Sequence, residues 1–435
     1  MKPEFHNGKL NSFQKTMLQW NELHPYNAAH VVRVAEPLDL DRLSRVINAH
    51  LQRLRLGKLS LDADRGTYRY HDEPVNCTVR SMDVSETPGN QLQAEIEREL
   101  NTGFDYTGPF CPFRFFVVSQ TDSFFLASTY FHPIADAESV VRLVRVLVDD
   151  YLKRAMADNP PGLETYPKRH DTLTRQSPAV FVKKLLALPR LVRNMRSSCR
   201  PPFRNPNDLA NRFTFFQLSP ASLPALHAAA KSLRVTLNDL FLALLLKSIA
   251  PLASRRMKAT RRRRLSVGCI VNLRRDLDAE TQKAFGLFLG SFIVTHMVPD
   301  DTNLKDLARE IGVITERIKR ARLYSGMLLE LSIGRLALHL FSTERKKTLY
   351  QKHYPLWGGI TNMNLNAIWD QQRVEKPVDY FRAVSTGPVT PLVLSITTAG
   401  NNVNIGVTYR SAVFSMEQVE QIKENFLRQV KQLEV

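Results

Sequence analysis

The sequence predicts an α/β or α+β fold made of two similar layered halves. Three observations lead to this prediction: strand-like and helical segments alternate along the chain, several neighbouring strands are close enough to form hairpins, and the same succession occurs on both sides of a proline-containing basic stretch. We therefore divide the chain into an N-terminal half (residues 1–160), a basic connecting segment (161–205) and a C-terminal half (206–435).

The N-terminal half is predicted to begin with a helix and to end on a hairpin. Apolar residues at spacings of three and four indicate helices, and period-two alternation indicates strands. In chain order the predicted elements are a helix over Ser12–Leu23, a strand over His30–Val34, a helix capped by Asp39, strands over Thr67–Tyr70 and Cys77–Arg80, a helix over Gln91–Leu100 and a hairpin over Phe113–Phe131. The second arm of this hairpin leads into His132.

The C-terminal half has the same ingredients without repeating the sequence. The predicted elements are a strand over Arg212–Leu218, helices that start near Ala221, Thr236 and Leu304, a strand over Leu265–Arg275, a hairpin over Val393–Arg410 and a final helix from Ser415. Two of the helix starts carry a capping box, Thr236 with Asp239 and Ser415 with Gln418. The helix after Thr236 is apolar on nearly every side, which predicts a place in the core.

The composition suits a large core but includes an excess of positive charge. The 435 residues are 43% hydrophobic and 23% charged, and 60 Lys and Arg against 42 Asp and Glu give a net charge of +18. Such an excess favours an acidic partner: nucleic acid, an anionic membrane, a phosphate-bearing cofactor or an acidic protein. The alternative is that the charge only keeps the protein soluble. The four cysteines do not have the spacing of a zinc site or a disulfide framework. Because the N-terminus does not resemble a signal peptide, we expect a cytoplasmic protein, with peripheral membrane contact still open.

Two basic stretches account for much of this charge. The connecting segment alternates basic and apolar residues at helical spacing, which is typical of a helix on a membrane, of a helix that docks an acidic protein, or of a surface helix packed on the body. The second stretch, Ser254–Arg264, has no interleaved aromatic residues and no nucleic-acid-binding motif, so nucleic acid is not the expected partner. The candidates for docking an anionic partner are Lys183, Lys184, Arg190, Arg193, Arg261 and Arg262.

One stretch combines a buried strand, a histidine and a helix start. The apolar arm of the first hairpin runs into His132, Asp136 follows after three intervening residues, and helical periodicity begins near Ser139. An imidazole at the mouth of a strand can be a general base, since its ordinary pKa is about 6.5; the alternative is a core histidine with satisfied hydrogen bonds. A second His-x-x-x-Asp, His296 to Asp300, is followed by a polar loop, so we interpret it as a strand exit.

The chain resembles the chloramphenicol acetyltransferase-like superfamily, and within it the condensation-domain-like acyltransferases. The family signature His-His-x-x-x-Asp-Gly aligns with Phe131 to Ala137, so that Phe131 replaces the first His and Ala137 replaces the Gly. Further segments occur in the family's order: NSFQKTMLQW, LDLDRLSRVINAH, GFDYTGPFCPFRFFV, VTLNDLFLALLL, VNLRRDL, FGLFLGSF and the final hairpin and helix. The resemblance therefore covers nearly the whole chain.

The resemblance implies two chloramphenicol acetyltransferase-like halves, each a mixed sheet with helices, that form a V with a central tunnel. Donor and acceptor would reach His132 from opposite faces, and His132 would act as the general base. Asp136 would have a structural role as the partner of an arginine, for which Arg274 is the candidate. Removal of either partner from such a buried pair would leave an uncompensated charge.

The resemblance also implies the reaction partners. The acyl donor would be a coenzyme A thioester or a phosphopantetheine thioester on an acidic acyl carrier protein, and the acceptor a small molecule or a lipid. We expect no metal and no bound cofactor, because the chemistry needs only a base and a donor for the oxyanion. The candidates for this donor are Ser291 in FGLFLGSF and Asn362 or Asn364 in TNMNLN, although such residues in loops often serve turns.

Three functions fit these observations. The first is an acyltransferase that moves an acyl group from a thioester to a hydroxyl or amine by direct attack, without a covalent enzyme intermediate. The second is a catalytically silent binding protein of the same fold, to which the replacements at Phe131 and Ala137 point. The third is a condensation enzyme that forms amides in natural-product assembly. We expect the first.

Overall fold

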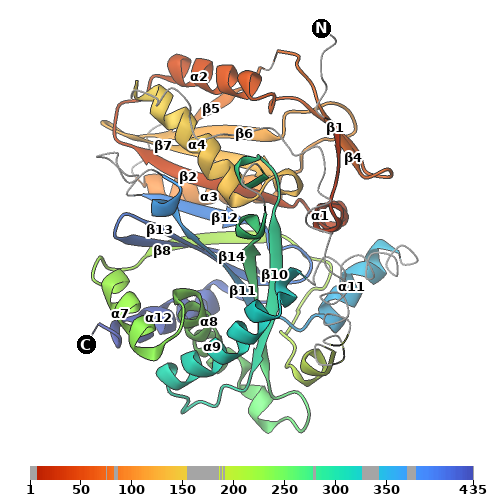
Figure 1. The fold of residues 1–435 in the computed structure, drawn as a ribbon, viewed down its shortest axis with the longest axis vertical. Helices are drawn as coiled ribbons and strands as arrows, with labels where there is room; N and C mark the ends of the chain where they lie inside the picture. Colours follow the sequence, from red (N-terminus) through yellow and green to blue (C-terminus); the bar gives the residue numbers. More distant parts are fainter. Residues whose placement is uncertain are drawn as a thin grey trace.

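The computed structural model describes residues 7–74, 76–82, 87–153, 186, 189, 192–277, 281–325, 342–369 and 379–434. Within these ranges the chain forms two mixed sheets with helices, one above the other in Figure 1, and a small sheet beside the first. The prediction of two halves that each contain a mixed sheet is confirmed. Much of the basic connecting segment, including Lys183, Lys184 and Arg190, lies outside the described residues.

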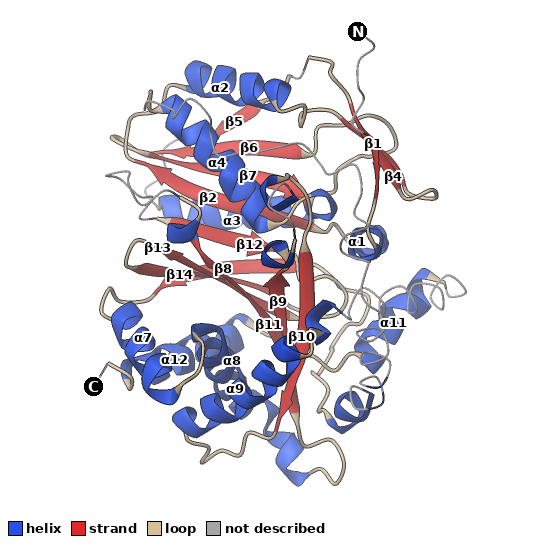
Figure 2. Cartoon of the chain, in the orientation of Figure 1, coloured by secondary structure: helices blue, strands red, loops and turns tan. Residues whose placement is uncertain are grey.

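The first sheet has the strand order β12-β2-β7-β6-β5. Its strands are β2 (Asn27–Val34), β5 (Val79–Met82), β6 (Phe113–Ser119), β7 (Phe124–Phe131) and β12 (Tyr380–Val384). Helices α2 (Leu40–Arg53) and α4 (Ala137–Tyr151) bury their apolar stripes on one face, and α3 (Pro88–Asn101) covers the other (Figure 2). The antiparallel pair β6 and β7 is the hairpin predicted over Phe113–Phe131.

The second sheet has the strand order β10-β9-β11-β13-β14-β8. Its strands are β8 (Asn211–Gln217), β9 (Leu265–Asn272), β10 (Leu289–His296), β11 (Gly358–Asn364), β13 (Leu392–Ala399) and β14 (Asn402–Arg410). The helices on its lower side in Figure 1 are α7 (Ser222–Leu233), α8 (Leu237–Ile249), α9 (Leu304–Arg320) and α12 (Met416–Lys431). The hairpin β13–β14 and the capping boxes that start α8 and α12 are present as predicted.

Helix α8 is a core helix. Together with the following 3-10 helix η2 (Ala250–Lys258) it is long and apolar enough to cross a membrane by length and composition. Every residue from Leu240 to Leu246, however, is at most 1% exposed, because neighbouring elements of the second half surround it. The expected place of this segment in the core is therefore confirmed.

Strand β12 departs from the division of the chain at residue 206. It follows β11 in the sequence, yet it pairs antiparallel with β2 at the edge of the first sheet, with Arg382 opposite His30. β12 also lies close against β14, where a Cβ atom on Gly406 would be 2.0 Å from the backbone oxygen of Arg382. Glycine at position 406 therefore permits the approach that joins the two halves.

Helix α1 (Ser12–Leu23) has the predicted boundaries and also bridges the halves. The side chain of Asn11, its N-cap, donates to the backbone oxygen of Leu287 at 3.1 Å, and Gln14 donates to that of Pro133 at 3.0 Å. Trp20 stands edge-on to Tyr350 of α11 (Thr343–His353), with ring centroids 6.5 Å apart. The remaining strands, β1 (Asn7–Lys9), β3 (Leu59–Asp62) and β4 (Thr67–Tyr70), form the small sheet.

Candidate active site

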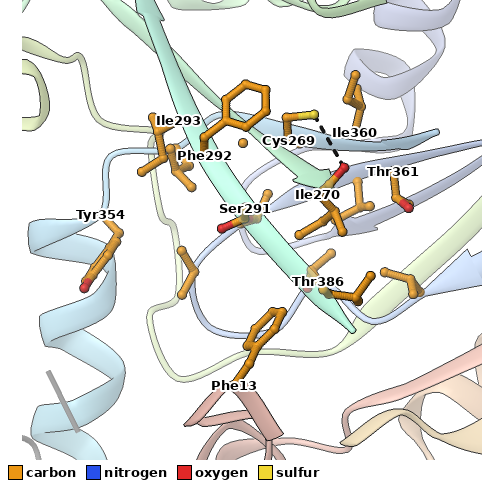
Figure 3. A pocket seen from close by; sticks show the side chains of 18 of the residues that line it. Phe13, Cys269, Ile270, Ser291, Phe292, Ile293, Tyr354, Ile360, Thr361 and Thr386 are labelled. Atoms are coloured by element: carbon orange, nitrogen blue, oxygen red, sulfur yellow. Dashed lines mark hydrogen bonds between the residues drawn. The ribbon is translucent and has the colours of Figure 1, made fainter. Parts of the chain in front are cut away.

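A cavity of about 630 Å³ lies where the two halves meet. Its wall comes from α1, β2, β7 and β12 on one side and from β9, β10 and β11 on the other. In Figure 3, Phe13 of α1 lies below strand β10, which carries Ser291. Thr361 of β11 lies to the right of this strand, and Tyr354, the residue after α11, lies to its left. Most of the lining side chains are apolar or aromatic.

His132 lies in this wall, in the turn between β7 and α4. Its Nδ1 is 3.0 Å from the backbone oxygen of Ala135. A carbonyl oxygen can only accept, so Nδ1 carries the proton in the neutral ring and the lone pair is on Nε2. Nε2 makes no hydrogen bond within the described part of the chain. The ring is also held by Tyr26, which stacks on it with centroids 5.4 Å apart and planes 12° apart.

The surroundings of His132 keep its imidazole neutral. Burial lowers its pKa to about 4, and the charge of Arg382 adds to the lowering. The hydrogen bond to Ala135 and the charge of Asp136 act in the opposite direction without reversing the shift. Near pH 7 the ring is therefore unprotonated and able to accept a proton at Nε2.

Asp136 forms the ion pair with Arg274 that the resemblance implied. Arg274 Nη2 lies 3.0 Å from each carboxylate oxygen, and both side chains are at most 4% exposed. Asp136 is also the N-cap of α4, where it accepts from the backbone N–H of Ser139 at 2.8 Å. It accepts in addition from the backbone N–H of Phe288 at 3.1 Å. The carboxylate is thus fully engaged and does not line the cavity.

The contacts around Asp136 join the two halves behind His132. The guanidinium of Arg274 donates to the backbone oxygens of Gln282 and Ala284 at 3.0 and 2.7 Å and stacks 4.4 Å above Phe288. The backbone N–H of Asp136 donates to Gly286 at 2.9 Å. A segment of the C-terminal half, residues 282–288, is therefore fixed against the turn that carries the histidine.

The two departures from the family signature have separate consequences. Phe131 is fully buried in an aromatic cluster with Phe104, Tyr106 and Phe110, with ring centroids 5.5–5.8 Å apart. It does not line the cavity. Ala137 does line the cavity at the first turn of α4. The replacement of the first histidine is thus a core substitution, whereas the methyl group of Ala137 reduces space near the site.

Of the three candidates for the oxyanion donor, one lines the cavity and two do not. Ser291, on β10, lines the cavity (Figure 3). Asn362 and Asn364 do not, so the tunnel position expected for them is not observed. The side chain of Asn364 accepts from the backbone N–H of Asn366 at 3.0 Å and caps a short 3-10 helix, which is the turn role that such residues often have. No group of three His, Cys, Asp or Glu side chains in the described ranges could hold a metal ion.

Sequence reasoning missed several polar residues of the wall, among them Tyr26, His30, Tyr130 and Arg382 around His132. Tyr130 precedes the signature by one residue and points to the opposite face of β7 from Phe131, so strand alternation could have identified it. Arg382 had no such signal, because its position beside His30 results from a pairing between residues far apart in the sequence.

Basic residues from the two predicted stretches meet at one edge of the cavity. Ser198 and Arg264 form an isolated bridge, and Arg262 Nη1 donates to the backbone oxygen of Ser198 at 3.1 Å. Arg264 is part of the cavity wall. Arg193 and Arg261 are exposed and belong to the same two stretches. We call Arg193, Arg261, Arg262 and Arg264 the basic rim.

Comparisons with known proteins identify the family and the fold of the chain. The sequence matches the Condensation domain family over residues 6–434. The fold is similar to that of the condensation domain of the monacolin K polyketide synthase MokA, with a TM-score of 0.69, 15% identity and coverage of 98% of this chain and 97% of that one. No curated protein sequence gives a significant match.

Two further solved structures have the same fold. One is the first condensation domain of the calcium-dependent antibiotic synthetase in complex with a substrate analogue (TM-score 0.73, 17% identity, coverage 98% of this chain and 97% of that one). The other is the trichothecene 15-O-acetyltransferase of Fusarium sporotrichioides (TM-score 0.70, 13% identity, coverage 99% and 96%). Since the family match spans nearly the entire sequence, this chain belongs to the Condensation domain family, a family of acyltransferases.

Proposed function

We propose that this protein transfers an acyl group from a coenzyme A or phosphopantetheine thioester to a hydroxyl or amine acceptor, with His132 as the general base. The observation that carries the proposal is the orientation of the imidazole. Its Nδ1 is fixed to the Ala135 carbonyl, and its unpartnered Nε2 belongs to a residue of the cavity wall. A histidine that only filled the core would need a partner for both nitrogens.

The reaction follows from this arrangement by direct attack. Nε2 takes the proton of the acceptor as its oxygen or nitrogen bonds to the thioester carbonyl carbon. The C–S bond then breaks, the carbonyl forms again, and the departing sulfur receives the proton from His132. Ser291, in the wall, is the candidate to stabilise the oxyanion between these steps. The protein forms no covalent bond to the acyl group in this scheme.

The shape and charge of the cavity support a thioester donor. Its mostly apolar lining suits an acyl chain. The basic rim at its edge suits the phosphates of coenzyme A or the acidic surface of an acyl carrier protein. The acceptor is then a small molecule or a lipid that reaches Nε2 through the same cavity.

The test is product detection by mass spectrometry. The protein is incubated with acetyl-, butyryl- and octanoyl-coenzyme A, and with octanoyl acyl carrier protein, in the presence of a panel of alcohols and amines. We expect ester or amide products that depend on the protein, and an intact protein mass that shows no acyl adduct. An accumulating acyl-enzyme would contradict direct attack. Acyl donors that bind but give no product with any acceptor would instead support the catalytically silent binding protein.

A further inference from the structure

A row of polar side chains crosses the first sheet beside the cavity. Arg382 of β12 stands opposite His30 of β2, and His30 stands opposite Ser128 of β7. Residues in register across a sheet share one face, and Tyr130 lies two residues beyond Ser128 on that face. Arg382, His30 and Tyr130 line the cavity together with His132, and each is at most 5% exposed. These residues form one buried polar region next to the candidate base.

Arg382 has no carboxylate partner in the described part of the chain. Its Nη2 donates to the backbone oxygens of Thr361 and Ile396 at 2.9 and 2.7 Å, and its Nε donates to Thr397 Oγ1 at 2.9 Å. Nη1 makes one long contact, 3.4 Å, with Thr361 Oγ1. These acceptors are neutral, so they hydrogen-bond the guanidinium without compensating its charge. A second N–H of Nη1 is left for a ligand.

The cavity wall as a whole is electropositive. None of its described residues is an aspartate or a glutamate, and its other charged side chains are the exposed Arg264 and Arg317. Burial, followed by the charge of Arg382, lowers the pKa of His30 well below its ordinary value, so that this ring is neutral like His132. The buried charge of Arg382 therefore has no counter-charge from the wall.

Tyr130 supplies a second unused donor at the same place. Its hydroxyl is buried and has no hydrogen-bond partner within the described residues. Its ring stands edge-on to both His30 and His132, with centroids 5.6 Å away in each case. A buried donor without a partner is unfavourable unless a ligand or a water supplies the acceptor. Two donors, one of them charged, thus border the candidate base.

We propose that Arg382 and Tyr130 bind a carboxylate of the substrate beside His132. The carboxylate would supply the missing counter-charge and would accept from the remaining N–H of Arg382 and from the Tyr130 hydroxyl. The inference rests on the proposed function, because it assigns the carboxylate to the acyl group or to the acceptor. The substrate class is therefore an acyl thioester or an acceptor that carries a carboxylate in addition to its reacting group.

The test compares two matched pairs of probes by isothermal titration calorimetry. Succinyl- and butyryl-coenzyme A differ by a carboxylate on the acyl group, and 8-hydroxyoctanoate and 8-hydroxyoctanamide differ by a carboxylate on the acceptor. We expect the carboxylate member of at least one pair to bind about tenfold more tightly, the size of one charge-assisted contact. A difference within the coenzyme A pair would place the carboxylate on the acyl group, and a difference within the hydroxyoctanoate pair would place it on the acceptor.

Three variants test whether the preference comes from this site. Arg382→Gln should remove it, whereas Arg317→Gln, which removes an exposed arginine of the same wall, should retain it. Tyr130→Phe, which deletes only a hydroxyl, should weaken the preference for the carboxylate. This variant provides the test if Arg382→Gln does not fold. Equal dissociation constants within both pairs for the unmodified protein, or a preference that survives Arg382→Gln, would overturn the proposal.

The carboxylate site and the proposed function can be refuted independently of each other. A carboxylate preference in binding, without transfer to any acceptor, would leave this site in place and refute the proposed function. Transfer that does not discriminate within either pair would support the proposed function and refute the site.

Discussion

The chain contains two His-x-x-x-Asp stretches, His132 to Asp136 and His296 to Asp300, and they share more than their spacing. Each histidine lies at the end of a strand, β7 or β10, and each lines the cavity. Nδ1 of each ring contacts a backbone oxygen, that of Ala135 at 3.0 Å for His132 and that of the next residue at 2.5 Å for His296. Spacing, strand context and even position at the cavity therefore do not separate them.

The second ring nitrogen separates them. Nε2 of His296 lies 2.8 Å from a carboxylate oxygen of Glu310, so both nitrogens of that ring are engaged. Nε2 of His132 has no partner within the described residues. A ring accepts a proton from a substrate only through a nitrogen whose lone pair is free. His132 can therefore act as a base, and His296 is held by its own neighbours.

The two aspartates also differ in burial and in their contacts. The Asp136 side chain is 1% exposed, caps α4 and pairs with Arg274. The Asp300 side chain is 77% exposed and lies 4.0 Å from Arg256. The first aspartate joins a helix start to the other half of the molecule, while the second borders a polar loop. The spacing alone therefore gives neither stretch its role, which depends on the contacts that the histidine and the aspartate make.

The largest effect is expected on catalysis at the two histidines. His132→Ala should lower kcat/KM for thioester transfer by about 10²- to 10⁴-fold, because it removes the general base. His296→Ala should change kcat/KM by less than about tenfold, since the ring has no free lone pair to offer. Both are measured with the acyl-coenzyme A assay, and circular dichroism checks the fold. Full activity of His132→Ala would make the base assignment wrong.

Next in size is the effect on stability at the two aspartates. Asp136→Ala should lower the free energy of unfolding by about 3–5 kcal/mol, because it leaves Arg274 buried without a counter-charge. Asp300→Ala, at an exposed site, should change it by less than about 0.5 kcal/mol. Urea unfolding followed by tryptophan fluorescence measures both. Similar values for the two variants would mean that the Asp136–Arg274 pair contributes little.

The pH dependence tests the environment of His132. Since its folded pKa is about 4 and its unfolded pKa about 6.5, the unfolded chain binds more protons between these values. Stability should therefore fall as the pH drops from 6.5 to 4, and His132→Gln should reduce that slope. The acid limb of kcat/KM should lie below pH 6 for the unmodified protein. An acid limb near 6.5 would show that the ring is hydrated.

The smallest effect is expected at the basic rim, in which Arg193 and Arg261 are exposed and Arg262 is partly buried. Replacing Arg193, Arg261 and Arg262 together by Ser should raise KM for acyl-coenzyme A roughly threefold to tenfold, because exposed charge pairs contribute ~0.2–1 kcal/mol each. The effect should disappear at 0.5 M salt and with an uncharged acyl-pantetheine donor, which serves as the control. A rise in KM of the same size with the uncharged donor would indicate altered structure instead of lost charge.

The elements whose signals are local could be predicted from the sequence alone. Helix α1 has the predicted limits, the capping boxes at Thr236 and Ser415 start α8 and α12, and both predicted hairpins are present. Periodicity and capping involve residues three or four apart, so they are readable along the chain. The stretch around His132 stood out for the same reason, as a strand followed directly by a helix start.

The distant residues that surround His132 could not be predicted in this way, because tertiary contacts bring them together. Arg382 and His30 are neighbours because β12 crosses to the first sheet, and Arg274 reaches Asp136 from the other half. The free nitrogen of His132 and the engaged one of His296 likewise depend on contacts between separate elements. Such contacts arise from sheet pairing and packing, whose partners leave no periodic pattern in a single sequence.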